Sequence, residues 1–173
     1  MKAKANLATI IVLLFVQSLY SQKARPSPNA SVSQTFGVTE VTVKYCRPGI
    51  KGRDVWNTNI APYGKVWRTG ANEATTITFT KDVKINGETV KAGSYTLFTI
   101  PDKAEWTIIL NKTTGQWGTQ YDSATDLMRF NVKAMVVEFK ERLEIDLDNP
   151  TDDSVELGIH WEKAKVKFKI EAA

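Results

Sequence analysis

The chain has 173 residues, 42% of them hydrophobic, one cysteine and a formal net charge of +4. Two of its lysines, Lys2 and Lys4, lie in a segment that we expect to be removed, and without them 21 basic residues stand against 19 acidic ones. This near balance excludes the strongly basic, clustered surface typical of nucleic-acid-binding domains, and the lone Cys46 excludes an internal disulfide.

The N-terminus has the pattern of a secretory signal peptide, residues 1–21. Two lysines precede a mostly apolar run over residues 7–16, and a small residue, Ser21, closes the segment. That order is typical of an export signal, and the run is shorter than the roughly 20 apolar residues that span a bilayer. We therefore expect a periplasmic or secreted mature chain, residues 22–173, with no transmembrane segment after cleavage; an uncut anchor is the alternative.

The remainder suits one domain, because a chain of about 150 residues can bury enough surface for its own core. Its first half reads as short strands. Residues 41–45 and 76–80 alternate apolar and polar side chains, the pattern of a half-buried strand. Residues 83–85 and 88–90 flank Asn86–Gly87, which predicts a hairpin with a type I′ turn because both central residues need positive φ.

The second half continues in the same way. Residues 94–100 are apolar on both faces and predict a central strand. Further alternating segments occupy residues 106–110, 128–132, 143–147, 155–161 and 166–170. We count roughly nine strands and no segment with sustained helical periodicity. The expected fold is all-β, a single antiparallel β-sandwich or a flattened barrel.

Metal and triad chemistry find little support in the sequence. The only histidine, His160, shares a strand face with Glu156 and Glu162, which is either a solvated face or a weak metal site. The acidic turn over residues 146–153 lacks the glycine and the ligand spacing of a calcium loop. No nucleophile-elbow or zinc-protease motif occurs. We therefore expect neither a metal nor a cofactor.

The most unusual stretch is VWRTGANEAT, residues 66–75. If the next strand begins at Glu73, then Glu73 shares a face with Ile77 and Phe79 and points toward the core. Arg68 would point the same way, and a half-buried charge persists only when it is paired. The sequence thus predicts an Arg68–Glu73 pair, which serves either as a structural clamp or as part of a ligand site.

A second group of polar and aromatic residues precedes this turn. Arg47 and Arg53 lie in a loop rich in proline and glycine, followed by Tyr63 and Trp67. Arginines bind carboxylates and phosphates bidentately, and aromatic rings stack on sugars and cations. Long loops in compact domains are often functional. These residues either line a shallow pocket or form an exposed loop with packed aromatics.

These stretches carry a family resemblance. The chain resembles the domain-of-unknown-function family numbered 2911, which consists of secreted bacterial proteins common in Bacteroidetes. The resemblance rests on YCRP at residues 45–48, KGR at 51–53, PYG at 62–64, WRTGANE at 67–73, AGSYTLF at 92–98 and IP at 100–101. It implies export and a single domain spanning most of the mature chain. It implies no activity, because that family has none agreed.

Three functions remain open from the sequence. The first is a non-enzymatic binding module for a small polar or anionic ligand or a glycan. Its expected ligand-binding residues are Arg47, Arg53, Tyr63, Trp67, Arg68, Asn72 and Glu73. The second is a hydrolase with Glu73 as general base, which a nearby Arg68 would disfavour by lowering the pKa of the carboxyl group. The third is a structural envelope domain in which WRTGANE is a folding clamp.

Overall fold

The computed structural model describes residues 24–173, so the predicted signal peptide lies outside the described residues. Within the described part the chain forms ten strands and one short 3₁₀ helix, η2 (Ser123–Thr125). The strands are β1 (Asn29–Phe36), β2 (Thr39–Cys46), β3 (Thr76–Phe79), β4 (Val83–Ile85), β5 (Glu88–Val90), β6 (Gly93–Ile100), β7 (Glu105–Asn111), β8 (Asp126–Lys133), β9 (Met135–Asp148) and β10 (Ser154–Ala172).

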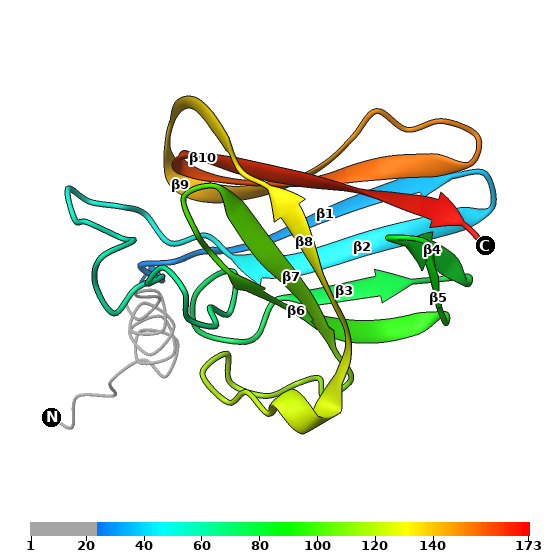
Figure 1. The fold of residues 1–173 in the computed structure, drawn as a ribbon, viewed down its shortest axis with the longest axis horizontal. Coiled ribbons are helices and arrows are strands. Elements are labelled where there is room, and N and C mark those ends of the chain that lie inside the picture. The colour runs from blue at the N-terminus through cyan, green and yellow to red at the C-terminus, as the bar shows by residue number, and fades with distance from the viewer. Residues whose placement is uncertain (1–23) are drawn as a thin grey trace, which may run out of the picture.

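The strands form two antiparallel sheets that face each other (Figure 1). One has six strands in the order β1-β2-β3-β6-β7-β8, and the other has four in the order β5-β4-β10-β9. The sheets do not close into a barrel, so the all-β prediction is confirmed and the sandwich is the form that it takes. The predicted turn at Asn86–Gly87 is also confirmed, because both residues have positive φ, +51° and +81°, between the paired strands β4 and β5.

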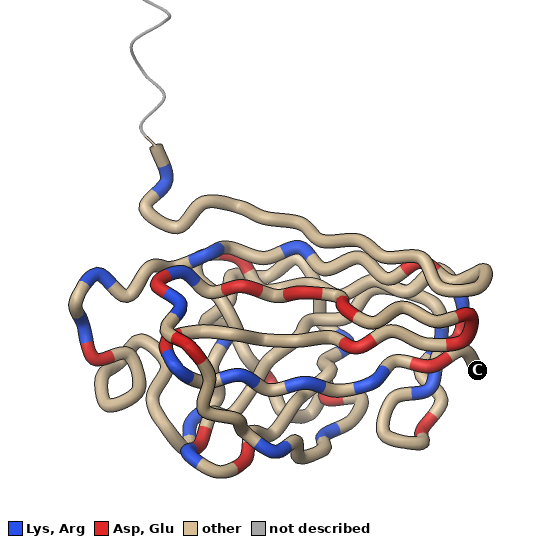
Figure 2. Tube along the Cα trace, turned by 90° about the horizontal axis from the view of Figure 1, so that it is seen from above, with Lys and Arg blue, Asp and Glu red and all other residues tan. Residues whose placement is uncertain are grey.

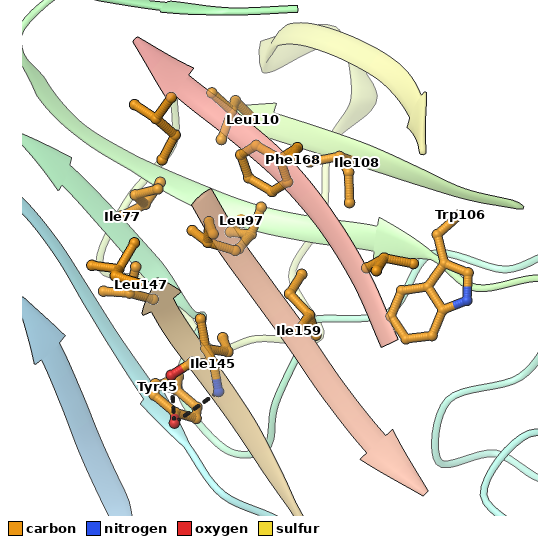
Figure 3. Packing of buried hydrophobic residues seen from close by; sticks show 14 of the residues in the cluster. Tyr45, Ile77, Leu97, Trp106, Ile108, Leu110, Ile145, Leu147, Ile159 and Phe168 are labelled. Carbon is orange, nitrogen blue, oxygen red and sulfur yellow. Dashed lines mark hydrogen bonds between the residues drawn. The ribbon is translucent and has the colours of Figure 1, made fainter. Parts of the chain in front are cut away.

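The core lies between the sheets and is built from the inward half of each alternating strand (Figure 3). Val41 and Val43 of β2, Ile77 of β3, Leu97 of β6 and Ile159 of β10 are all fully buried. At roughly 25 cal/mol per Å² of apolar surface removed from water, such residues supply most of the stabilisation. The charged residues lie outside this core, and Figure 2 shows basic and acidic positions interspersed along the trace.

One buried tyrosine joins the two sheets directly. The hydroxyl group of Tyr45 on β2 accepts a hydrogen bond from the N–H of Ile145 on β9 at 2.9 Å and donates to the C=O of the same residue at 3.3 Å (Figure 3). β9 is an edge strand, so these backbone groups have no strand partner on that side. Tyr45 therefore satisfies two groups that burial would otherwise leave unpaired.

Candidate functional site

The segment between β2 and β3, residues 47–75, carries most of the residues that the sequence singles out, and it runs along one end of the strands (Figure 1). Its first part, like Tyr45, makes hydrogen bonds to the free edge of β9. The N–H of Leu143 donates to the C=O of Pro48 at 3.1 Å, and Nε of Arg47 donates to the C=O of Leu143 at 2.8 Å. This part of the segment therefore seals a strand edge and serves the fold.

The two arginines predicted to hold a ligand in this loop bond to backbone instead. Besides the contact of Arg47, the guanidinium of Arg53 donates to the C=O of Ile50 at 2.9 Å and to the C=O of Gly49 at 2.6 Å. The bond from Arg47 fixes the loop against β9, whereas the bonds from Arg53 close a turn within the loop itself. The structure does not bring either arginine together with Arg68.

The aromatic residues of the segment pack in a tryptophan cluster at the same end of the core. Trp67 stacks on Trp161 with ring centroids 5.3 Å apart and planes 12° apart, and it is only 3% exposed. Tyr63 stacks on Trp56 at 5.5 Å. Because their faces are occupied by other rings, these two residues act mainly as core and wall, rather than as free platforms for stacking on a ligand.

The WRTGANE turn has a strained backbone. Thr69 and Asn72 have positive φ, +50° and +59°, a conformation that is rare for a β-branched residue such as threonine. Hydrogen bonds hold Thr69 in place: its hydroxyl group lies 3.1 Å from that of Thr99, and its C=O accepts from the hydroxyl group of Thr75 at 2.9 Å. Strain that the surroundings enforce in this way is concentrated at functional sites, so the turn stays a candidate.

The predicted Arg68–Glu73 pair is wrong. The carboxylate of Glu73 faces solvent, with 53% of the side chain exposed, and it accepts two bonds of 2.8 Å from Nη2 of Arg25. Nε of Arg68 instead makes a long contact of 3.4 Å with the C=O of Gly70. The reason is that β3 begins at Thr76 and not at Glu73, so the alternation that places Ile77 in the core does not extend back to the glutamate.

Glu73 stands at one end of a groove on the outer face of the six-stranded sheet, which we call the Glu73 groove. Its volume is about 580 Å³, and it is lined by Asn29, Ala30, Ser31, Lys44, Tyr45, Cys46, Glu73, Ala74 and Thr76. Sγ of Cys46 lies 3.3 Å from Oε2 of Glu73 and 3.2 Å from Oδ1 of Asn29, so its one S–H group is shared between these two acceptors. The bonds from Arg25, followed by those from backbone and Cys46, lower the pKa of Glu73 to about 2.

Cys46 itself is poorly suited to nucleophilic chemistry. The residue is 3% exposed, and burial raises the pKa of its thiol, an effect that the hydrogen bond to Glu73 strengthens. A thiolate beside the carboxylate of Glu73 would be disfavoured for the same reasons. The thiol acts here as a donor that helps to fix Glu73.

A second loop completes the edge of the turn. Residues 116–118 run beside residues 72–74, with the N–H of Gly118 donating to the C=O of Asn72 at 3.0 Å. Trp117 lies directly opposite Glu73 in this short ribbon, and 49% of it is exposed. Residues opposite each other in an antiparallel pair project to the same face, so Trp117 presents an indole ring beside the carboxylate. The ligand-binding residues predicted from the sequence do not include this tryptophan, whose only local signal is its place between Gly115 and Gly118 in a polar loop.

Arg68 lines a different hollow on the other side of the turn, which we call the Arg68 groove. The volume is about 430 Å³, and the lining residues are Asn59, Ile60, Pro62, Lys65, Val66, Trp67, Arg68, Phe98, Gly118, Thr119 and Tyr121. A Cβ on Gly118 would lie 2.5 Å from Cδ of Arg68, so glycine is what lets the arginine stem pass so close to the loop. Burial lowers the pKa of Arg68, and among residues 24–173 no carboxylate bonds to it.

The remaining sequence candidates do not form a metal centre. His160 is half-buried, and its Nε2 lies 2.9 Å from the C=O of Glu138. Its strand neighbour Glu156 bonds to Asn149 at 2.6 Å and approaches Lys167 at 3.6 Å. Within the described chain, no group of three or more histidine, cysteine, aspartate or glutamate side chains is arranged to hold a metal ion.

Comparison with known proteins adds the family. A search of the curated proteins and of the solved structures finds no match. In residues 24–173, no helix has the length and apolar character needed to cross a membrane. The model of a family described as a protein of unknown function, DUF2911, matches residues 27–170. The chain therefore belongs to the DUF2911 family, as its WRTGANE and neighbouring motifs lead one to expect.

Proposed function

We propose that this protein is a non-enzymatic binding module that takes a small anionic or polyhydroxylated ligand, glycans included, in the Arg68 groove. The observation that carries the proposal is the state of Arg68. It is a half-buried guanidinium that lines a groove of about 430 Å³, and no carboxylate within the described chain compensates its charge. A partly buried charge without a partner is costly, and an incoming anion would offset that cost.

The rest of the groove fits such a ligand. Lys65 adds a second cation to the lining, and Asn59 and Thr119 add neutral polar groups. Phe98 and Tyr121, an edge-to-face pair with centroids 4.9 Å apart, provide part of an apolar wall. Binding sites for small molecules combine apolar walls with a few placed polar groups in this manner. Of the residues predicted from sequence, Arg68 and Trp67 belong to this groove.

The hydrolase alternative loses support. A general base at neutral pH needs a pKa near the working pH, whereas Arg25 and its neighbours hold the pKa of Glu73 at about 2. The carboxylate is also largely exposed, so little desolvation is available to raise its pKa. The structural-clamp alternative rests on the strained backbone of Thr69 and Asn72 and on the hydrogen bonds to Thr99 and from Thr75 that hold Thr69 in place. We also propose export of the chain, on the basis of the N-terminal signal pattern alone.

The experiment is a thermal-shift screen of the purified protein against small carboxylates, phosphorylated and acidic sugars, and neutral glycans. A ligand at about 100 times its dissociation constant adds about 2.7 kcal/mol, which raises the melting temperature by several degrees in a domain of this size. We expect a shift in the wild type that Arg68→Met removes. Methionine keeps an apolar stem against Gly118 but carries no charge.

Two controls make the result specific. Lys112→Met removes an exposed lysine outside the groove and should leave the ligand-induced shift intact. Arg68→Lys keeps a charge but loses the planar fork, so a ligand held bidentately should bind more weakly to this variant. A shift that persists in Arg68→Met would refute the assignment of the site. No shift with any compound, together with an early melt of Arg68→Met, would favour the structural clamp.

A further inference from the structure

The contact between Arg25 and Glu73 has the form of ligand recognition. Nη2 of Arg25 bonds to both carboxylate oxygens of Glu73 at 2.8 Å, and Nη1 donates to Oδ1 of Asn29 at 2.9 Å. The one S–H group of Cys46 is shared between the two acceptor residues from the side of the sheet. The carboxylate of Glu73 and the amide oxygen of Asn29, oriented by the thiol, thus form a preorganised receptor for one guanidinium group. The group that occupies it comes from a residue four positions before Asn29.

The occupant is held loosely enough to leave. The two side chains of the pair are 43% and 53% exposed, so water reaches the ion pair. Exposed pairs of this kind contribute little to stability, because solvent screens them. The segment that carries Arg25 has one short anchor, the N–H of Arg47 to the C=O of Pro28 at 2.8 Å. The contacts of Pro26 and Ser27 are longer, 3.4 and 3.5 Å.

The Glu73 groove continues past the position that Arg25 takes. Its floor runs along the outer face of β1, β2 and β3, where Ser31, Lys44 and Thr76 lie side by side. Lys44 and Cys46 are two residues apart on β2, so their side chains leave the same face roughly 7 Å apart. Lys44 is exposed, and no carboxylate within the described residues pairs with it. The groove therefore has an acidic end at Glu73 and a basic end at Lys44.

We propose that the Glu73 groove binds a guanidinium compound that also carries a carboxylate, of the size of free arginine or an arginine at the end of a peptide, and that Arg25 is its intramolecular competitor. Glu73 and Asn29 take the guanidinium, and Lys44 takes the carboxylate. This goes beyond the function proposed above and does not rest on it, because it concerns another groove and a ligand end of opposite charge.

The short chain segment that carries Arg25 determines how strongly Arg25 competes with a free ligand. A group on a short flexible linker has an effective concentration in the millimolar range. If free arginine binds the open receptor with a dissociation constant on the order of 1 mM, a tethered Arg25 at roughly 10 mM weakens apparent binding about tenfold. Removal of Arg25 should therefore leave the receptor open to free arginine. If the ion pair is purely structural, no arginine should bind after its removal.

The experiment is a titration of the full-length mature protein with L-arginine, followed by NMR shifts of the Glu73 and Cys46 amides. We expect about tenfold tighter binding in Arg25→Ala than in the wild type, and none in the double variant Arg25→Ala with Glu73→Gln. N-butylguanidine, which lacks the carboxylate, should bind Arg25→Ala more weakly than L-arginine does. Lys44→Met in that background should remove the difference between the two compounds.

Each possible outcome bears on the proposal. Arginine affinity that is the same with and without Arg25 would overturn the competitor role. Binding that survives Glu73→Gln would overturn the site. Equal affinity for L-arginine and N-butylguanidine would overturn the proposal that the groove recognises the ligand's carboxylate. Lys112→Met changes a residue outside both grooves and should bind arginine as the wild type does. The two grooves are tested with different ligands and different variants, so failure here and failure of the Arg68 groove are distinguishable.

Discussion

Replacement of Tyr45 by phenylalanine removes one oxygen atom from the contact between the two sheets. That oxygen accepts from the N–H of Ile145 at 2.9 Å and donates to its C=O at 3.3 Å, and Tyr45 is 7% exposed. Phenylalanine keeps the ring and its packing. The substitution therefore isolates the hydrogen bonds, and the N–H of Ile145 is left buried without an acceptor.

The size of the expected destabilisation follows from this unpaired N–H group. A buried donor without a partner costs about 1–3 kcal/mol. In a domain of this size each kcal/mol corresponds to about 2–4 °C in melting temperature, so we expect a decrease of about 2–12 °C. The measurement is urea denaturation and calorimetry of Tyr45→Phe beside the wild type.

The matched control is Tyr95→Phe. The hydroxyl group of Tyr95 also donates to a backbone C=O, that of Lys91 at 2.9 Å, but at the surface, where water replaces it. We expect this control to stay within about 0.5 kcal/mol of the wild type. Equal stability of both variants would show that the Tyr45 hydroxyl does not hold the sheets together.

Three further predictions concern the turn, the ion pair and the thiol. Gly87→Ala should destabilise the protein by about 1–2 kcal/mol in urea denaturation, because φ is +81° there and an L side chain disfavours it; unchanged stability would contradict the type I′ turn. Arg25→Ala should raise the pKa of Glu73 from about 2 toward the ordinary 4.5 in an NMR titration; in the wild type the pair's contribution is complete above pH 4.5 and is lost as the pH falls through about 2. Cys46, buried and with a raised thiol pKa, should react with a thiol reagent at pH 8 far more slowly in the native than in the urea-unfolded protein, and equal rates would show that the site is open.

The fold was largely predictable because its signals are local. Alternation with period two identified the strand segments, and Asn86–Gly87 specified its hairpin within four residues. Two strand assignments differ from the structure. β1 was missed, because its inner face has only Ala30, Val32 and Phe36 as apolar residues and Gln34 interrupts them. Residues 155–161 and 166–170 were read as two strands, whereas they form the single strand β10. Sheet order was beyond reach, because pairings such as that of β3 with β6 join segments separated by a hairpin of the other sheet.

The candidate site was predicted in place but not in geometry. WRTGANE does stand between two grooves, yet the partner of Glu73 is Arg25, 48 residues away along the chain. No local pattern reports such a contact. Parity misled the assignment of Glu73 because β3 begins only at Thr76, and Glu73 pairs instead with Trp117 of the neighbouring loop. Arg47 was predicted to bind an anion because the sequence does not reveal that the C=O of Leu143, on the edge strand β9, needs a donor.

The bond from Tyr45 to Ile145 spans 100 residues of chain, and its neighbours from Arg47 and Pro48 to Leu143 span nearly as many. Contacts between such distant segments require a large loop to close before they contribute, which slows folding. On a growing chain, β1, β2 and β3 emerge first and can pair among themselves, but their inner face stays uncovered until β9 and β10 follow. The sheet formed by the first third of the chain can therefore bury its inner face only after the last third has been synthesised.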